Sequence, residues 1–175
     1  IETAEGRAGF QIYRGQFINY RNLGELYEEN GNITDAMQAY QNSLDAAQKA
    51  YENRYSVNGS PESCEDLRMA YEKLAIIKHA EGKFNDAIEL YKECVKLEKW
   101  LMENVGTEKE QRDYFSTLLN LGTAYRVVKK TTDAQNVFEQ CISMVGKVDV
   151  PLDALATLYV NLAIVRNKNG NFSEA

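Results

Sequence analysis

The sequence predicts an all-α fold made of repeated antiparallel helix pairs, and three observations lead to this prediction. The chain of 175 residues contains only two prolines, and strong helix formers such as Ala, Glu, Leu, Lys and Gln dominate it. One pattern of large and small residues recurs four times along the chain. Glycines fall between the two halves of most copies, where an antiparallel helix pair needs a turn.

The first half of each copy predicts a helix with a notch on one face. A bulky residue is followed three positions later by Leu and directly afterwards by Gly or Ala. These residues share one helical face, and the tiny residue lets a second helix approach closely. The four copies are Tyr20-Leu23-Gly24, Tyr71-Leu74-Ala75, Leu118-Leu121-Gly122 and Tyr159-Leu162-Ala163.

The second half of each copy predicts the helix that packs into this notch. It has the spacing Ala-x-x-x-aromatic-x-x-small, as in Ala36-Tyr40-Ser43, Ala87-Tyr91-Cys94 and Ala134-Phe138-Cys141. Gly31, Gly82 and Gly170 each lie seven residues after the small residue and are predicted to form the turn. The third copy has residues 129–132 (Lys-Lys-Thr-Thr) there instead, which predicts a less tight turn.

Together these patterns predict helices over 10–30, 33–56, 61–81, 84–104, 108–129, 132–145, 151–169 and from 172 onward. Helix starts are indicated by Ser60-Pro61, by Pro151 and by a capping box of Thr107 and Glu110. Three glycines mark helix ends: Gly59, Gly106 and Gly146.

Leu-Gly-x-x-Tyr followed by Ala-x-x-x-aromatic, in tandem, resembles the tetratricopeptide repeat over about residues 17–175. The resemblance implies one domain, a right-handed α-solenoid of antiparallel helix hairpins. Residues 1–16 would be a lead-in or the remnant of a preceding repeat. The repeats would span 17–60, 61–106, 107–149 and a truncated 150–175.

The repeats are longer than the standard unit. The small residues Gly24, Ala75, Gly122 and Ala163 follow one another at intervals of 51, 47 and 41 residues. The interval in the standard unit is about 34 residues. The family's proline near the end of the second helix is absent, so extended second helices account for most of the extra length. In this respect the chain is similar to kinesin light chain-like repeats.

The charge balance and the cysteines exclude several classes of function. Lys and Arg total 20 against 26 Asp and Glu, so no basic field favours nucleic acid or an anionic membrane as partner. The sequence has no apolar run long enough for a membrane helix and no signal peptide. Three cysteines without a C-x-x-C pair argue against a disulfide framework or a zinc site and favour a reducing compartment. We therefore predict a cytoplasmic protein.

No pattern in the sequence supports catalysis. Phosphate-binding loops, zinc-protease motifs and nucleophile elbows are absent from the sequence. The single histidine, His79, is expected to be solvated or lightly packed, and Cys94 and Cys141 are expected in the core. Cys64 lies in the first turn of a helix, where its pKa could be lowered, although neighbouring acidic residues such as Glu62 oppose this. We expect no enzyme, no metal and no cofactor.

The resemblance assigns a concave peptide-binding groove to the first helices. Asparagine recurs two positions before the small residue in three copies, and its amide could bond both the N–H and the C=O of an extended peptide. The alternative is that these residues are tolerated polar residues retained from a common ancestral repeat. The candidate groove residues are Arg21, Asn22, Lys73, Ile76, Leu119, Asn120, Thr123, Arg126, Val160, Asn161, Ile164 and Lys168.

The predicted function is a non-catalytic protein-interaction module, a scaffold or adaptor that binds a peptide or an extended protein segment. An acidic C-terminal tail is not the expected ligand, because Glu25, Ile76, Thr123 and Ile164 replace an asparagine of the carboxylate clamp that some family members have. The alternative is the sensor region of a larger signalling protein, such as a peptide-responsive transcription regulator or a repeat-bearing ATPase. Self-association through an uncapped C-terminal helix face is a further possible partner interaction.

Overall fold

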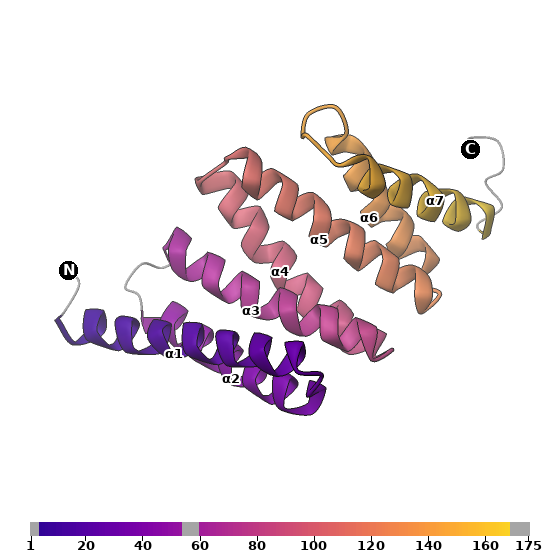
Figure 1. Cartoon of the computed structure of the whole chain (residues 1–175). Helices are drawn as coiled ribbons and strands as arrows, with labels where there is room; N and C mark the ends of the chain where they lie inside the picture. Colours follow the sequence, from indigo (N-terminus) through magenta and orange to yellow (C-terminus); the bar gives the residue numbers. More distant parts are fainter. Residues whose placement is uncertain (1–3, 54–59, 169–175) are drawn as a thin grey trace. The chain divides into compact units, whose positions relative to one another are not determined.

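The structure is a computed structural model that describes residues 4–53 and 60–168. Figure 1 shows that its elements are helices joined by short connections. They are α1 (Ala4–Glu29), α2 (Ile33–Asn53), α3 (Pro61–Ala80), α4 (Phe84–Asn104), α5 (Glu108–Val127), α6 (Thr131–Met144) and α7 (Leu152–Lys168). The chain divides into two compact units, Ile1–Ile77 and Lys78–Ala175, and each is described by itself below.

Within the described residues the predicted helices are confirmed except at the start of the chain. The predicted end of the second helix at residue 56 and the helix end marked by Gly59 lie outside the described residues. We expected the first helix to begin at residue 10, but α1 begins at Ala4, because burial outweighs the helix cost of Gly6, Gly9 and Gly15. Phe10 and Phe17 on this helix are both fully buried. Residues 4–16 therefore continue the helix of the first repeat. The helix expected from residue 172 and the turn at Gly170 lie outside the described residues.

In the first unit, α1 and α2 form the predicted tight pair. A Cβ atom built on Gly24 would lie 2.5 Å from Cε1 of Tyr40, so only glycine permits this approach. The Tyr40 ring is buried, and its hydroxyl donates to Glu28 Oε2 at 2.8 Å. The Ser43 hydroxyl donates to the carbonyl oxygen of Phe17 at 3.1 Å. The small residues thus hold the two backbones close together.

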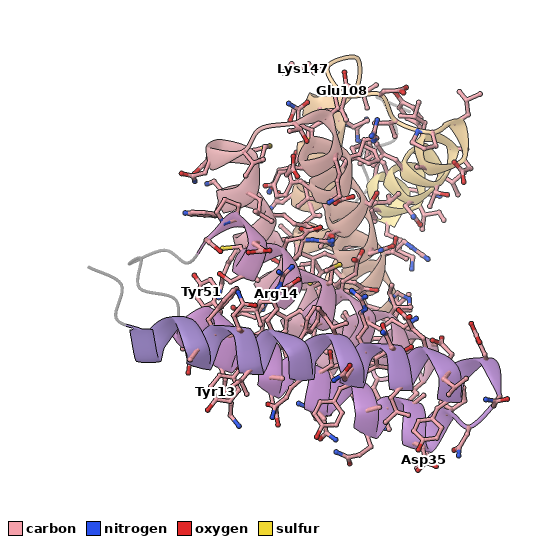
Figure 2. All side chains as sticks on the ribbon, turned by 60° about the vertical axis from the view of Figure 1, so that its left-hand side comes forward. Tyr13, Arg14, Asp35, Tyr51, Glu108 and Lys147 are labelled. Atoms are coloured by element: carbon pink, nitrogen blue, oxygen red, sulfur yellow. The ribbon has the colours of Figure 1, made fainter. Side chains whose placement is uncertain are left out.

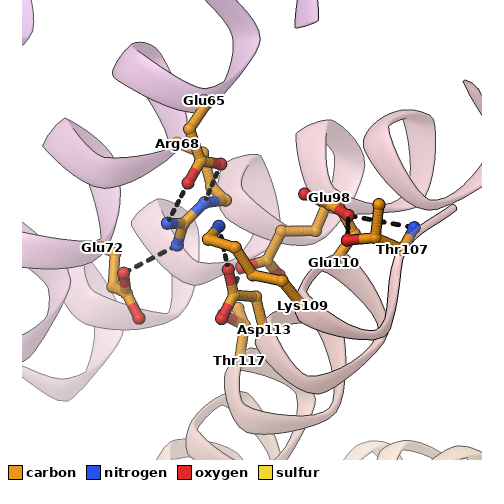
Figure 3. Close-up of polar contacts among 9 residues, drawn as sticks. All are labelled: Glu65, Arg68, Glu72, Glu98, Thr107, Lys109, Glu110, Asp113 and Thr117. Carbon is orange, nitrogen blue, oxygen red and sulfur yellow. Dashed lines mark hydrogen bonds and ion pairs between the residues drawn. The ribbon is translucent and has the colours of Figure 1, made fainter. Parts of the chain in front are cut away.

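The second unit repeats this arrangement between α5 and α6. A Cβ atom on Gly122 would lie 2.5 Å from Cε1 of Phe138. Between α4 and α5, the buried Thr117 hydroxyl donates to Glu98 Oε1 at 2.9 Å, and the Glu98 carboxylate is itself buried (Figure 3). Ala163, at the corresponding position of α7, is exposed.

The three described hairpin turns have one geometry, so the prediction of a looser third turn is wrong. Gly31 and Gly82 have φ of 73° and 75°, and Lys129 takes the same left-handed conformation with φ of 63°. In each turn the left-handed residue donates its N–H three residues back, and the next residue donates five residues back. Lys129 adopts a conformation that costs an L-residue about 1–2 kcal/mol.

The predicted helix starts are confirmed with one small shift. Ser60 caps α3, because its Oγ accepts the Ser63 N–H at 3.1 Å. Thr107 and Glu110 form the predicted capping box at the start of α5 (Figure 3). Pro151 precedes the first helical residue of α7, and its carbonyl accepts the Leu155 N–H at 3.1 Å.

Candidate functional site

The first unit contains a shallow hollow between α1 and α3, with a volume of about 200 Å³. It combines charged side chains with exposed apolar surface, since Ile76 is 45% exposed. Arg21, Lys73 and Ile76 were predicted as groove residues, and the structure brings them together here. The full lining is Arg21 and Glu25 from α1 and Met69, Glu72, Lys73 and Ile76 from α3.

A network of ion pairs connects α1 to α3. Arg14, labelled on α1 in Figure 2, donates from Nε to Asp66 Oδ2 at 2.8 Å and also pairs with Glu62. Asp66 is buried, and this burial raises the pKa of its carboxyl even though Arg14 acts in the opposite direction. Because the pairs join different helices, they fix how α3 lies on α1 and so position the hollow.

Two of the charged side chains of the hollow are already engaged. Lys73 Nζ lies 2.8 Å from Glu28 Oε2 and 5.1 Å from the centre of the Tyr40 ring. The hydrogen bond from Lys73 is the main reason that the pKa of Glu28 is lowered. Glu72 accepts a hydrogen bond from Arg68 Nη1 at 2.7 Å (Figure 3). These contacts leave little capacity for a ligand at Lys73 and Glu72.

Arg21 differs from these residues because its Nε atom is buried and has no hydrogen-bond partner within the described part of the chain. The nearest carboxylate oxygen, Glu25 Oε1, lies 3.8 Å away, beyond hydrogen-bond distance. Its Nη2 donates to Asn22 Oδ1 at 3.5 Å, and its guanidinium lies 5.5 Å from the centre of the Phe17 ring. A buried donor without a partner is unfavourable, so an incoming acceptor would be stabilised here.

In the second unit the predicted groove residues lie on α5 and α7 in unequal environments. Val160 is 60% exposed, and Arg126 carries a buried Nε with no hydrogen-bond partner within the described residues. Leu119 is buried. Half-buried residues are Asn120, Thr123, Arg126 and Ile164, and Lys168 is exposed.

The three asparagines of the predicted ladder are not equivalent. Asn22 is exposed, Asn120 is half-buried, and Asn161 is buried. Asn161 Nδ2 donates to Thr123 Oγ1 at 3.2 Å, so part of its amide is used within the fold. The common sequence position did not reveal this difference, because it depends on the neighbouring helix.

The cysteines and the histidine belong to the packing of the helices. Cys94 and Cys141 are buried, as predicted, and burial raises the pKa of the Cys141 thiol to about 12. For Cys64 burial outweighs any effect of the helix N-terminus and raises the pKa to about 11, so the possible lowering is not found. His79 is half-buried with its ring edge-on to Phe84, 5.1 Å between ring centres, and burial lowers its pKa.

The described residues contain neither a candidate metal site nor a helix suited to cross a membrane. No group of three or more His, Cys, Asp or Glu side chains within 4–53 and 60–168 is placed to hold a metal ion. None of the seven described helices is long and apolar enough to cross a membrane.

The tight helix pairs and the recurring turn define a protein built from helix-hairpin repeats. A sequence model of the tetratricopeptide repeat matches residues 19–52 and 70–99. These two segments are therefore identified as tetratricopeptide repeats, and the predicted resemblance is confirmed. Such repeats generally mediate protein–protein interactions and generally serve as non-catalytic scaffolds.

Solved structures support the same fold over most of the chain. BtubC (BKLC) from P. vanneervenii aligns with a TM-score of 0.64 and 23% identity, covering 97% of this chain and 68% of that one. TPR-like repeats described as a kinesin light chain of Podosopora anserina align with a TM-score of 0.51 and 16% identity, covering 92% of this chain and 90% of theirs. Among curated proteins none matches the sequence. The all-α solenoid fold predicted from the sequence is confirmed.

Proposed function

We propose that the chain binds an extended peptide or protein segment along its first helices, and that the hollow between α1 and α3 is one contact site. The observation that carries this proposal is the buried Nε of Arg21, which has no hydrogen-bond partner among the described residues. A backbone carbonyl or a side-chain oxygen of the ligand would satisfy this donor. Ile76, 45% exposed in the same hollow, would contact an apolar side chain of the ligand.

Two features of the hollow favour a peptide over a small molecule. The hollow is open and shallow, whereas pockets for small molecules bury most of the ligand in a cavity of about 300–1,000 Å³. Of its other charged groups, Lys73 and Glu72 already bond to residues of the chain, and Glu25 lies 3.8 Å from Arg21 with its side chain 51% exposed. A ligand would therefore gain one strong polar contact and some apolar contact at this place, and further contacts must come from other helices. An extended segment can make such distributed contacts.

In the second unit we propose that Asn120, Arg126 and Val160 contact the ligand, because they keep exposed surface or an unused donor. Asn161 contributes less, since its amide donates to Thr123. Leu119 is buried and would act by holding α5 in place.

Binding can be tested with a phage-displayed library of random peptides. Peptides selected on the 175-residue chain would be synthesised, and their affinities measured by fluorescence anisotropy for Arg21→Ala and Ile76→Asp. We expect either change to raise Kd by about tenfold or more, as for the loss of a buried contact of about 1.4 kcal/mol.

Matched controls are available on exposed surface elsewhere. The Arg112 side chain is 43% exposed, and its Nη1 lies 3.8 Å from Glu108 Oε2, so it matches the weak ion pair of Arg21. Val105 is 40% exposed, close to the 45% of Ile76. Arg112→Ala and Val105→Asp should leave Kd unchanged. Failure to select any peptide, or equal affinity of all four variants, would refute the proposal.

A further inference from the structure

The hollow between α1 and α3 holds a hydrogen-bond donor and a hydrogen-bond acceptor side by side on one helix. Arg21 has a buried Nε without a hydrogen-bond partner in the described part of the chain, and its side chain as a whole is 33% exposed. Glu25 Oε1 lies 3.8 Å from this Nε, too far for a hydrogen bond between them, and the Glu25 side chain is 51% exposed. An incoming group that both donates and accepts can therefore bond to the two side chains at once.

The other charged groups of the hollow are less available to a ligand. Lys73 is bonded to Glu28 at 2.8 Å, and Glu72 is bonded to Arg68 at 2.7 Å. The lining thus leaves one basic and one acidic side chain, Arg21 and Glu25, to bind an incoming group.

Arg21 is already held in place. Its guanidinium lies 5.5 Å from the centre of the Phe17 ring, which is fully buried one turn earlier on α1. Its Nη2 also donates to Asn22 Oδ1 at 3.5 Å. A donor whose position is fixed before binding loses less conformational entropy when the ligand arrives. The guanidinium is therefore suited to receive an oxygen atom of the ligand.

The charges of the hollow favour a neutral group over an ion. Its lining holds two basic and two acidic residues, so it carries no net charge. A carboxylate or phosphate bonded to Arg21 would lie close to the Glu25 carboxylate and be repelled. A cation bonded to Glu25 would be repelled by the Arg21 guanidinium in the same way. A neutral group with its own donor and acceptor avoids both repulsions.

The main chain of an extended segment is such a group. One residue of a strand directs its N–H and its C=O to the same neighbour, and the two hydrogen bonds are closely spaced. Apolar surface lies in the same hollow, since Ile76 is 45% exposed and Met69 is half-buried. This surface would contact an apolar side chain of the segment.

We propose that Arg21 and Glu25 bind the main chain of one residue in an extended, uncharged segment of the ligand. The Arg21 guanidinium donates to the C=O of that residue, and the Glu25 carboxylate accepts its N–H. The hollow then selects an extended backbone with an apolar side chain and not a charged motif. This inference rests on the proposed function and adds the chemistry of the ligand at this contact.

Ester substitution in the phage-selected peptides tests the main-chain contact. Replacing the N–H of one residue by oxygen removes the donor and keeps the C=O of that residue. Each position would be replaced in turn, and Kd measured by fluorescence anisotropy for the 175-residue chain and for Glu25→Ala. We expect one position at which the ester raises Kd by about fivefold for the unchanged chain but not for Glu25→Ala, as for one lost hydrogen bond. An ester at the next position weakens the C=O of the same residue, and this effect should disappear in Arg21→Ala.

Glu108→Ala is the matched control. Glu108 Oε2 also lies 3.8 Å from an arginine four residues away, Arg112, and this pair is outside the hollow. The control should leave Kd and every ester effect unchanged. Glu25→Gln should keep most of the affinity, because its amide oxygen still accepts an N–H. A large loss in Glu25→Gln would show that Glu25 binds a ligand cation, and it would overturn the main-chain contact.

The outcomes separate this inference from the proposed function. If Arg21→Ala weakens binding but no ester position depends on Glu25, the main-chain contact is refuted and the proposed function stands. An Asp or Glu side chain in the selected peptides whose replacement by Asn or Gln weakens binding only when Arg21 is present would show an anionic ligand and also refute it. If no peptide is selected, the proposed function fails and this inference fails with it.

Discussion

Replacing Gly24 by Ala tests the claim that the helix pairs depend on tiny residues. The added Cβ would lie 2.5, 2.7 and 2.9 Å from three atoms of the Tyr40 ring, whereas carbon atoms in contact are normally separated by about 3.5–4.0 Å. The ring must therefore move by about 1 Å or the helices must separate. The ring cannot move freely, because the Tyr40 hydroxyl donates to Glu28 at 2.8 Å.

The expected effect is the difference between two opposing terms. Overpacking costs about 1–3 kcal/mol, and loss of the Tyr40–Glu28 hydrogen bond adds up to about 1 kcal/mol. Alanine gains about 1 kcal/mol over glycine in a helix interior. We expect Gly24→Ala to lower the free energy of unfolding by up to about 3 kcal/mol, since the helix gain of alanine offsets only the smallest overpacking cost.

Gly15 provides the matched control on the same helix. A Cβ there would meet no atom within 4 Å, so Gly15→Ala should raise the free energy of unfolding by about 1 kcal/mol. Urea denaturation followed by circular dichroism at 222 nm, the standard helix signal, measures both variants. If Gly24→Ala proved as stabilising as Gly15→Ala, the close approach of α1 and α2 would be refuted.

Three further outcomes follow from individual contacts. Lys129→Gly should raise the free energy of unfolding by about 0.5–1 kcal/mol in urea denaturation. Glycine removes the strain of the left-handed conformation, and its greater entropy in the unfolded chain offsets part of this gain. Gly31→Ala, at the equivalent turn, should lower the free energy of unfolding. Thr117→Val should lower it by about 1–3 kcal/mol, since the buried Glu98 carboxylate loses a donor, and no change would contradict this contact. His79 has a lowered pKa in the folded state, so the unfolded state binds the proton more tightly and stability should fall as the pH drops through about 6.5 toward the folded pKa. Urea titrations at several pH values should show that this fall in the free energy of unfolding disappears in His79→Phe. The same pH profile in the variant would contradict the assignment to His79.

The features that could be predicted from the sequence are those fixed by local spacing. The notches at Gly24 and Gly122 follow from one small residue beside a regular apolar stripe, and the structure confirms both. The capping box at Thr107 depends on two side chains three residues apart. Such features need no knowledge of other helices.

The failed predictions depended on packing between helices, which local sequence patterns do not show. The start of α1 was placed too late because its glycines suggested an interruption, whereas Phe10 and Phe17 are buried and Arg14 pairs with Asp66, 52 residues away. The third turn was expected to be looser because residue 129 is Lys. This turn has the same backbone geometry as the turns at Gly31 and Gly82, because the helices on either side impose it.

The asparagines show why a repeat position does not determine a chemical role. Asn22, Asn120 and Asn161 occupy one position of the repeat, yet their exposure falls from exposed to buried. In the second unit α7 packs on α5, and Asn161 uses its amide to bond Thr123 across that contact. On α1, Asn22 keeps its exposed surface. The packing of the next helix, more than the residue type, therefore decides which asparagine is available to a ligand. The binding contribution of each must be judged from its own surroundings.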